Sequence, residues 1–196
     1  MIRPLIALLI AAGPAFGAAG NDPDWPCIQR KQPQLSLGQV WSGPAPDEAA
    51  EALVRERPIA LLAERIEQRR MPVDEAEAEI AAFAEDAEPA QLVALMLATF
   101  NRIERDRSAL MAGISRYGRS QVTLAARIEE RRARMEEMEA AEAPDFDAID
   151  AEEVALDWDK RIFTERQQQL TYVCETPVIL EQRIFALGRA IQSHLD

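Results

Sequence analysis

Histidine, cysteine and glycine are scarce in this chain of 196 residues, and their scarcity argues against several kinds of chemistry. The one histidine is His194, near the last residue, which makes it a poor member of a Ser-His-Asp or Cys-His catalytic site. Too few His and Cys residues are present to favour a zinc site, and no Gly-rich phosphate loop occurs. We therefore predict a protein with no catalytic residues, no metal site and no cofactor.

Long apolar runs are also missing, since no segment beyond the start of the chain suits a bilayer span of about 20 residues. The start combines Arg3, a short apolar stretch and small residues before position 17, which is typical of a signal peptide. We predict a signal peptide over residues 1–17, cleaved after Gly17, with the bonds after Ala18 and Ala19 as alternatives. An uncleaved N-terminal anchor is the competing interpretation.

Basic side chains are in the minority, with 22 Lys and Arg against 34 Asp and Glu and a net charge of −12. A strongly acidic protein is repelled by nucleic acid and by anionic membrane surfaces, so neither is an expected partner. The charge is compatible with a basic protein partner or with solubility alone.

The two cysteines, Cys27 and Cys174, are an even pair in a chain that opens like an exported protein. Such a pair predicts a disulfide and an oxidising compartment, here the periplasm. Reactive or intermolecular thiols are the alternative. The bridge would join residues 18–46, a Pro-rich segment with scattered apolar residues, to the last quarter of the chain. We expect this segment to run extended as a strap across a folded body.

From Asp47 onward the composition is that of α-helices. We expect a helix over 47–70, capped by Asp47 and kinked or divided at Pro58, and a second over 74–86 that begins with an Asp74–Glu77 capping box. A third helix should begin at Pro89, with a cap near Asp86, and run without interruption to residue 143.

A heptad stripe runs along this third helix and argues for coiled-coil-like packing. At about 1.5 Å per residue the helix would be roughly 80 Å long, too long for a compact globule, so part of it should project. Arg107 and Gln121 interrupt the stripe and either set the register or mark a change of neighbour. The stripe consists of Met96, Phe100, Ile103, Arg107, Leu110, Ile114, Tyr117, Gln121, Leu124, Ile128, Arg131, Met135 and Met138.

The chain should then turn near residue 146 and return as an antiparallel helix capped by Asp150. Thr176-Pro177 predicts a kink or restart, and the last helix has one apolar face. We expect Cys174 to lie beside Gly113, Tyr117 and Gly118. The returning helix carries a spaced set that we expect to face the long helix: Ala151, Ala155, Trp158, Ile162, Glu165, Gln169 and Tyr172.

The predicted fold class is all-α, a helical bundle with a long antiparallel coiled-coil-like hairpin and an extended N-terminal strap. One helical domain spans residues 47–196. Its base comprises 47–115 and 177–196, and its projecting hairpin comprises 118–172. A three- or four-helix bundle of even length is the rival architecture.

The expected hairpin tip gathers acidic and aromatic side chains. Phe146, Asp147, Asp150 and Trp158 are the candidate residues for binding a partner. A calcium site and a merely solvated loop are the alternatives, although the EF-hand pattern is absent. Along the arm helix, arginines 127, 131, 132 and 134 alternate with glutamates, as in a solvent-facing helix with pairs at i to i+4.

The sequence around Cys27 carries one resemblance. Asp24-Trp25-Pro26-Cys27-Ile28-Gln29, with Gln39-Val40-Trp41-Ser42-Gly43-Pro44, resembles the start of exported alphaproteobacterial proteins with no established activity. The resemblance covers about twenty residues and implies the periplasm.

We expect a non-enzymatic periplasmic protein that works through protein–protein contact, as a scaffold, assembly factor or chaperone-like module. Its partner would be a periplasmic or envelope protein. The alternative is a helical bundle that binds a small ligand or ion, with an enzyme less favoured. Self-association is also open, since a heptad stripe pairs within or between chains.

Overall fold

The computed structural model describes residues 22 and 24–195, which form six α-helices and no strand. The predicted signal peptide, residues 1–17, lies outside these residues, as does the beginning of the strap. The helices are α1 (Leu37–Val40), α2 (Glu48–Leu53), α3 (Arg57–Ile66), α4 (Val73–Ala84), α5 (Pro89–Glu139) and α6 (Phe146–Gln192).

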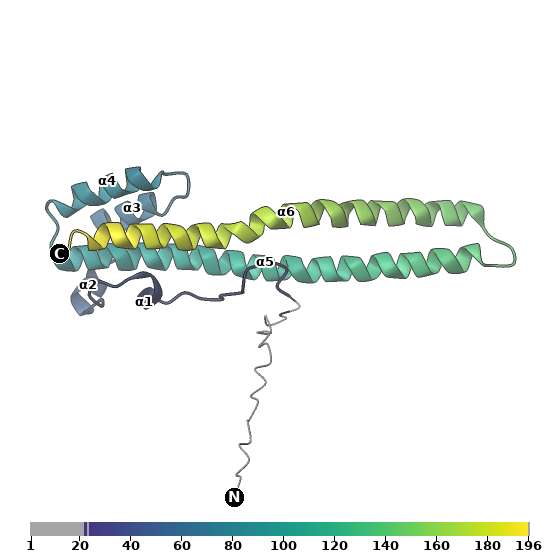
Figure 1. The fold of residues 1–196 in the computed structure, drawn as a ribbon, viewed down its shortest axis with the longest axis horizontal. Helices are drawn as coiled ribbons and strands as arrows, with labels where there is room; N and C mark the ends of the chain where they lie inside the picture. Colours follow the sequence, from purple (N-terminus) through teal and green to yellow (C-terminus); the bar gives the residue numbers. More distant parts are fainter. Residues whose placement is uncertain (1–21, 23, 196) are drawn as a thin grey trace, which may run out of the picture.

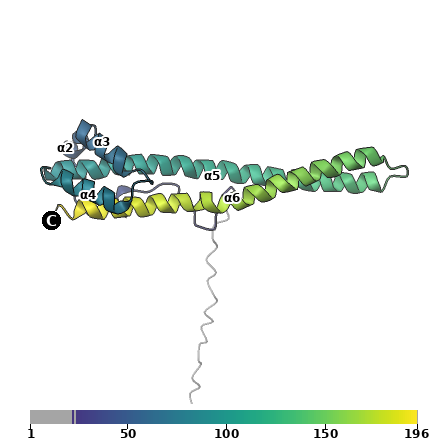
Figure 2. The ribbon, with the colours of Figure 1, turned by 90° about the horizontal axis from the view of Figure 1, so that it is seen from above.

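Two long antiparallel helices, α5 of 51 residues and α6 of 47 residues, form the frame of the molecule (Figure 1). Every one of the thirteen stripe residues on α5 is buried or half-buried, so the predicted packing face is confirmed. The all-α hairpin is confirmed with it. The short helices α2, α3 and α4 gather at one end of this frame, and the other end is the bare hairpin (Figures 1 and 2).

The end that carries the short helices, called the base below, has a continuous apolar core. Helix α2 has its N-cap at Asp47, whose side chain accepts a hydrogen bond from the Ala50 N–H, as predicted. Pro58 stands in the first turn of α3 and divides the predicted 47–70 helix in two. The core of the base includes Ile59, Leu62, Ile66, Ile80, Leu95, Met96, Ile103, Ile184, Leu187 and Ile191.

The bare hairpin, called the arm below, has a separate and smaller core. It consists of Leu124 and Ile128 from α5 and Leu156 from α6, with half-buried apolar neighbours. Two helices alone can cover only one face of each other, so the arm buries little apolar surface compared with the base.

Three of the predicted helix caps are wrong, although α5 begins at Pro89 as predicted. Helix α4 begins at Val73 with Pro72 as its N-cap, two residues before the start that an N-cap at Asp74 requires. The N-cap of α5 is Glu88 and not Asp86, although Pro89 does stand in its first turn. Helix α6 has its N-cap at Asp145, which accepts a hydrogen bond from the Ala148 N–H, so Asp150 lies inside the helix. The hairpin turn accordingly lies at residues 140–145.

The predicted inner face of the returning helix is also wrong, by one position. Leu156 and Asp159 face α5, whereas Trp158 and Tyr172 are 61% and 75% exposed. The heptad spacing predicts that the aromatic residues Trp158 and Tyr172 lie inside. The structure instead places a carboxylate inside, because two arginines of α5 neutralise it.

Helix α6 runs through Pro177 without restarting, and Pro177 is buried within it. Proline lacks the N–H that would bond the carbonyl four residues earlier, so a change of direction is the usual response. Figure 1 shows the ribbon of α6 changing direction about midway. Among the described residues, no helix combines the length and apolar character needed to cross a bilayer.

Candidate functional site

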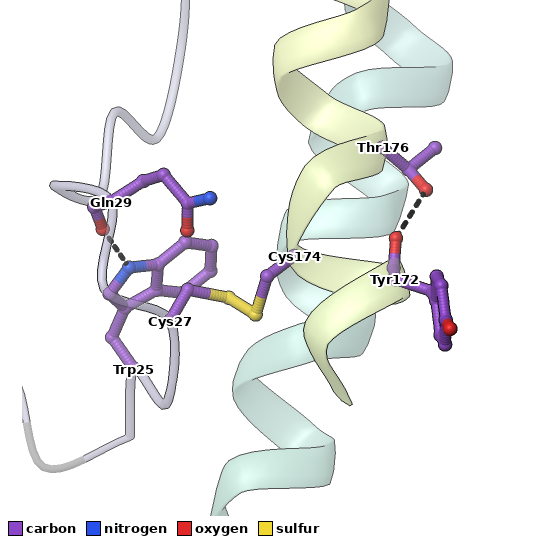
Figure 3. Close-up of a disulfide and its surroundings, with 6 residues drawn as sticks. All are labelled: Trp25, Cys27, Gln29, Tyr172, Cys174 and Thr176. Atoms are coloured by element: carbon purple, nitrogen blue, oxygen red, sulfur yellow. Dashed lines mark hydrogen bonds between the residues drawn. A yellow bond between two sulfur atoms is a disulfide. The ribbon is translucent and has the colours of Figure 1, made fainter. Parts of the chain in front are cut away.

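The strap crosses the frame where base and arm meet, and the predicted disulfide between Cys27 and Cys174 holds it there. The bridge joins residues 147 positions apart, with their Cα atoms 5.6 Å from each other. Figure 3 shows Trp25 lying beside the bridge, its ring N–H donating to the carbonyl of Gln29 at 2.6 Å. The disulfide is consistent with an oxidising compartment.

Arg107 fixes the middle of the strap and is the buried residue that interrupts the heptad stripe. It is 1% exposed. Its guanidinium donates to the Glu181 carboxylate of α6 at 2.7 Å and to the Gln32 carbonyl of the strap at 2.6 Å. Glu104, one turn earlier, accepts from the Leu35 N–H. Arg107 therefore ties three segments together, a role that neither earlier interpretation included.

Two helix glycines allow the strap to approach closely. A Cβ on Gly118 would lie 2.7 Å from the Asp24 carbonyl oxygen, and one on Gly188 would lie 2.9 Å from that of Val40. Both distances are shorter than real Cβ contacts allow. The strap therefore lies directly on Gly118, whereas a Cβ on Gly113 would meet only the side chain of Arg116 at 3.8 Å.

The candidate partner-binding residues all lie on the outside of the arm, near its tip. Phe146 is 72% exposed, and Asp147, Asp150 and Trp158 are exposed as well. Asp147 and Trp158 are eleven positions apart and so share a face of α6, but they lie about 16 Å from each other along the helix, and Phe146 lies about 18 Å from Trp158. The four residues are all exposed, but they do not form one pocket.

A shallow cleft lies beside Trp158, with a volume of about 530 Å³. Val154, 72% exposed, stands one turn before Trp158 and forms part of the same wall. An exposed pair of large apolar side chains on a helix is a common sign of an interaction surface. The cleft is completed by Arg131, Ala151, Ala155, Asp157, Asp159 and Arg161.

Beneath the cleft, a group of ion pairs joins the two arm helices. Arg127 binds both carboxylate oxygens of Asp159 at 2.6 and 2.9 Å, and Arg131 bridges Asp159 and Glu152, each at 2.9 Å. The hydrogen bond from Arg127, helped by both positive charges, holds the pKa of Asp159 below its usual range although burial raises it. Arg127 and Arg131 therefore pair across the hairpin. Arg132 pairs within α5, but with Glu129 at i,i+3 spacing instead of the expected i,i+4.

The tip is acidic well beyond this group. Residues 135–159 contain eleven carboxylates and no Lys, Arg or His. Three of them form ion pairs with basic residues: Glu152, Asp157 and Asp159. The remaining eight are exposed and form no ion pair with any described residue. The sequence showed this charge, but it gave no sign that Trp158 and Val154 stand outside the packed seam.

Within residues 22 and 24–195, no group of three or more His, Cys, Asp or Glu side chains is placed to hold a metal ion. No family model matches the chain, and no curated protein or solved structure matches it either. The structure itself defines the class: an all-α protein built on one long antiparallel hairpin, with its strap joined by a disulfide.

Proposed function

We propose that this protein is a non-enzymatic protein of the periplasm that works by protein–protein contact, with the arm as its docking element. The observation that carries the proposal is the exposure of Trp158 and Val154 on an acidic helix that has no further covering layer. Buried Trp side chains contribute strongly at interfaces, so an exposed one beside a cleft is a candidate anchor.

The charge of the tip selects the kind of partner. Eight exposed carboxylates without ion pairs attract a basic surface and repel an acidic one. A partner that suits the site therefore presents Lys or Arg residues around an apolar group that fills the cleft beside Trp158. The signal-peptide pattern, the disulfide and the resemblance of the opening residues support the periplasm as the place of contact.

The proposal is tested by photo-crosslinking from single positions in the exported protein. A photoreactive residue replaces Trp158 in one strain and Val122 in another. Val122 of α5 is a matched control because it is 60% exposed against 61% for Trp158. We expect a specific adduct from position 158 and none from 122, and we expect the captured protein to carry a basic segment.

The dissociation constant of the purified partner then measures how much Trp158 contributes to binding. Trp158→Ala should raise the dissociation constant about thirtyfold, which corresponds to the loss of a hot spot of about 2 kcal/mol. Val122→Ala should leave the dissociation constant unchanged. Asp147→Asn with Asp150→Asn should weaken binding more at low than at high salt. Glu75→Gln with Glu77→Gln on α4 is the control with the same change in charge. Adducts from both positions, or from neither, would overturn the proposal.

A further inference from the structure

A second cleft, of about 480 Å³, lies between the strap and α5, on the base side of the disulfide. Its floor is formed by Met111 and Ser115, both buried, and the strap closes one side with Lys31, Pro33 and Gln34. The other side is formed by exposed residues of α5, namely Ala112, Arg116 and Arg119. Its volume falls in the range of small-molecule sites, about 300–1,000 Å³.

Three cations stand at one end of this cleft, in a protein whose net charge is −12. Lys31 is matched by Asp22 at 2.6 Å and Arg119 by Asp24 at 2.8 Å. Arg116 forms no hydrogen bond or ion pair with any residue that the structure describes. One positive charge is therefore left over, which suits a single negative charge on a ligand.

An unsatisfied hydroxyl lies beside the surplus charge. Ser115 is 7% exposed, and its Oγ has no hydrogen-bond partner among residues 22 and 24–195. A buried polar group without a partner is costly, so a ligand that accepts a hydrogen bond from it would be favoured. The other serine of the cleft, Ser108, already donates to Glu104 at 2.8 Å.

The nearest acidic residues of α5 do not cancel this charge. Asp106, ten positions before Arg116 and so about 15 Å along the helix, pairs with Arg105. Glu104 and Glu181 flank Arg107 and leave that cluster with one surplus negative charge. Glu104 is twelve positions before Arg116, about 18 Å along the helix, which exceeds the Debye length of about 8 Å at physiological salt. The cleft thus has a cationic end near Arg116 and an apolar middle at Met111 and Pro33.

We infer that this cleft binds an organic monocarboxylate with a compact apolar body. The carboxylate lies on the guanidinium of Arg116, which is shaped to donate two parallel hydrogen bonds to it. The Ser115 hydroxyl donates a further bond, and the apolar body lies against Met111 and Pro33. The ligand would contact both strap and α5 and so hold the two together.

The test is calorimetric titration of the oxidised full chain with octanoate, with octanol and octylamine as neutral and cationic probes of the same chain length. We expect saturable binding of octanoate that is at least about tenfold tighter than that of either other probe, since a charged hydrogen bond is lost in both. Arg116→Gln should abolish the preference for octanoate. Arg55→Gln removes the same charge from an exposed site in the base and should leave the preference intact.

A second measurement distinguishes binding at this site from non-specific hydrophobic binding of octanoate. Octanoate should slow hydrogen exchange at strap residues 31–34, and Ser115→Ala should weaken octanoate binding without lowering the stability of the free protein, because its hydroxyl is unpaired. Equal affinity for octanoate in the native chain and in Arg116→Gln would overturn the inference. So would the absence of saturable binding at millimolar octanoate.

Discussion

Asp159 is the residue at which the two helices of the arm are joined by charge. It is 4% exposed and receives hydrogen bonds from Arg127 and Arg131 of the opposite helix. An ionised carboxylate in such a place is stable only because both arginines compensate its loss of water. Arg107 has the corresponding role at the strap, where Glu181, Glu104 and a backbone carbonyl surround it.

Acid should loosen the arm through Asp159. The hydrogen bond from Arg127 lowers the folded-state pKa of Asp159, so its contribution to stability is complete above its unfolded value, about 3.9. That contribution is lost as the pH falls through the lower folded value. Hydrogen exchange of the arm amides, corrected for intrinsic rates, should therefore accelerate below about pH 4.

The variant Asp159→Asn should show weaker arm protection already at neutral pH and a smaller further loss in acid. Asp157→Asn is the matched control, since Asp157 is exposed and pairs only with Lys160. An unchanged acid response in Asp159→Asn would contradict the prediction.

Among the elements, α5 was the most predictable and α6 the least. A heptad stripe and an N1 proline identify α5 because long uninterrupted periodicity leaves few alternatives. In α6 the apolar residues indicate the outer face, and the inner face includes Asp159, whose partners are 28 and 32 positions away. No local pattern reveals such a partner.

Asp147 and Trp158 were proposed from the sequence as partner-binding residues, and the structure shows only that both are exposed. The cleft beneath the strap was not predicted, since its walls come from distant segments.

Alanine substitutions at the two glycines of α5 distinguish the effect of helix propensity on stability from the effect of contact with the strap. Gly113→Ala should raise the free energy of unfolding by about 0.5–1 kcal/mol, because glycine is unfavourable within a helix and the nearest atom is 3.8 Å from the new Cβ. Gly118→Ala should lower it instead, since the new Cβ would lie 2.7 Å from the Asp24 carbonyl oxygen and push the strap away.

Urea unfolding of the two glycine variants measures the difference, and hydrogen exchange at residues 24–26 locates it. Gly113→Ala is thereby the control for Gly118→Ala, because both replace a glycine in the same helix. Equal shifts of the same sign in both variants would show that the strap does not press on α5 at Gly118.

At the scale of the whole molecule, the structure is a rigid base, a thin arm and a strap that is held in several places. The base has the larger apolar core, whereas the arm depends on a small core and on ion pairs. The strap is attached by the disulfide at one end and by buried Val40 and Trp41 at the other. Between them Arg107 binds the Gln32 carbonyl.

Removing the disulfide should therefore free only part of the strap. Cys27→Ser or Cys174→Ser should lower the free energy of unfolding by up to about 5 kcal/mol in the chain-entropy model, because a loop of nearly 150 residues is no longer closed. Exchange should rise at residues 24–31, while residues 35–46 stay protected by Trp41 and Val40.

The double variant should match either single one, since all three lack the same bond. Thiol labelling of the exported native protein gives the complementary test. Two free thiols, or an equal loss of protection along the entire strap, would contradict this account.

The positions of the two cysteines have a consequence for a protein whose tip is exposed. Cys27 and Cys174 lie on opposite sides of the turn at residues 140–145, so the covalent ring that they close contains that turn. A protease that cuts the turn once opens the ring without separating the chain. Both halves remain one covalent molecule and retain the paired helices, and only a reductant releases two fragments.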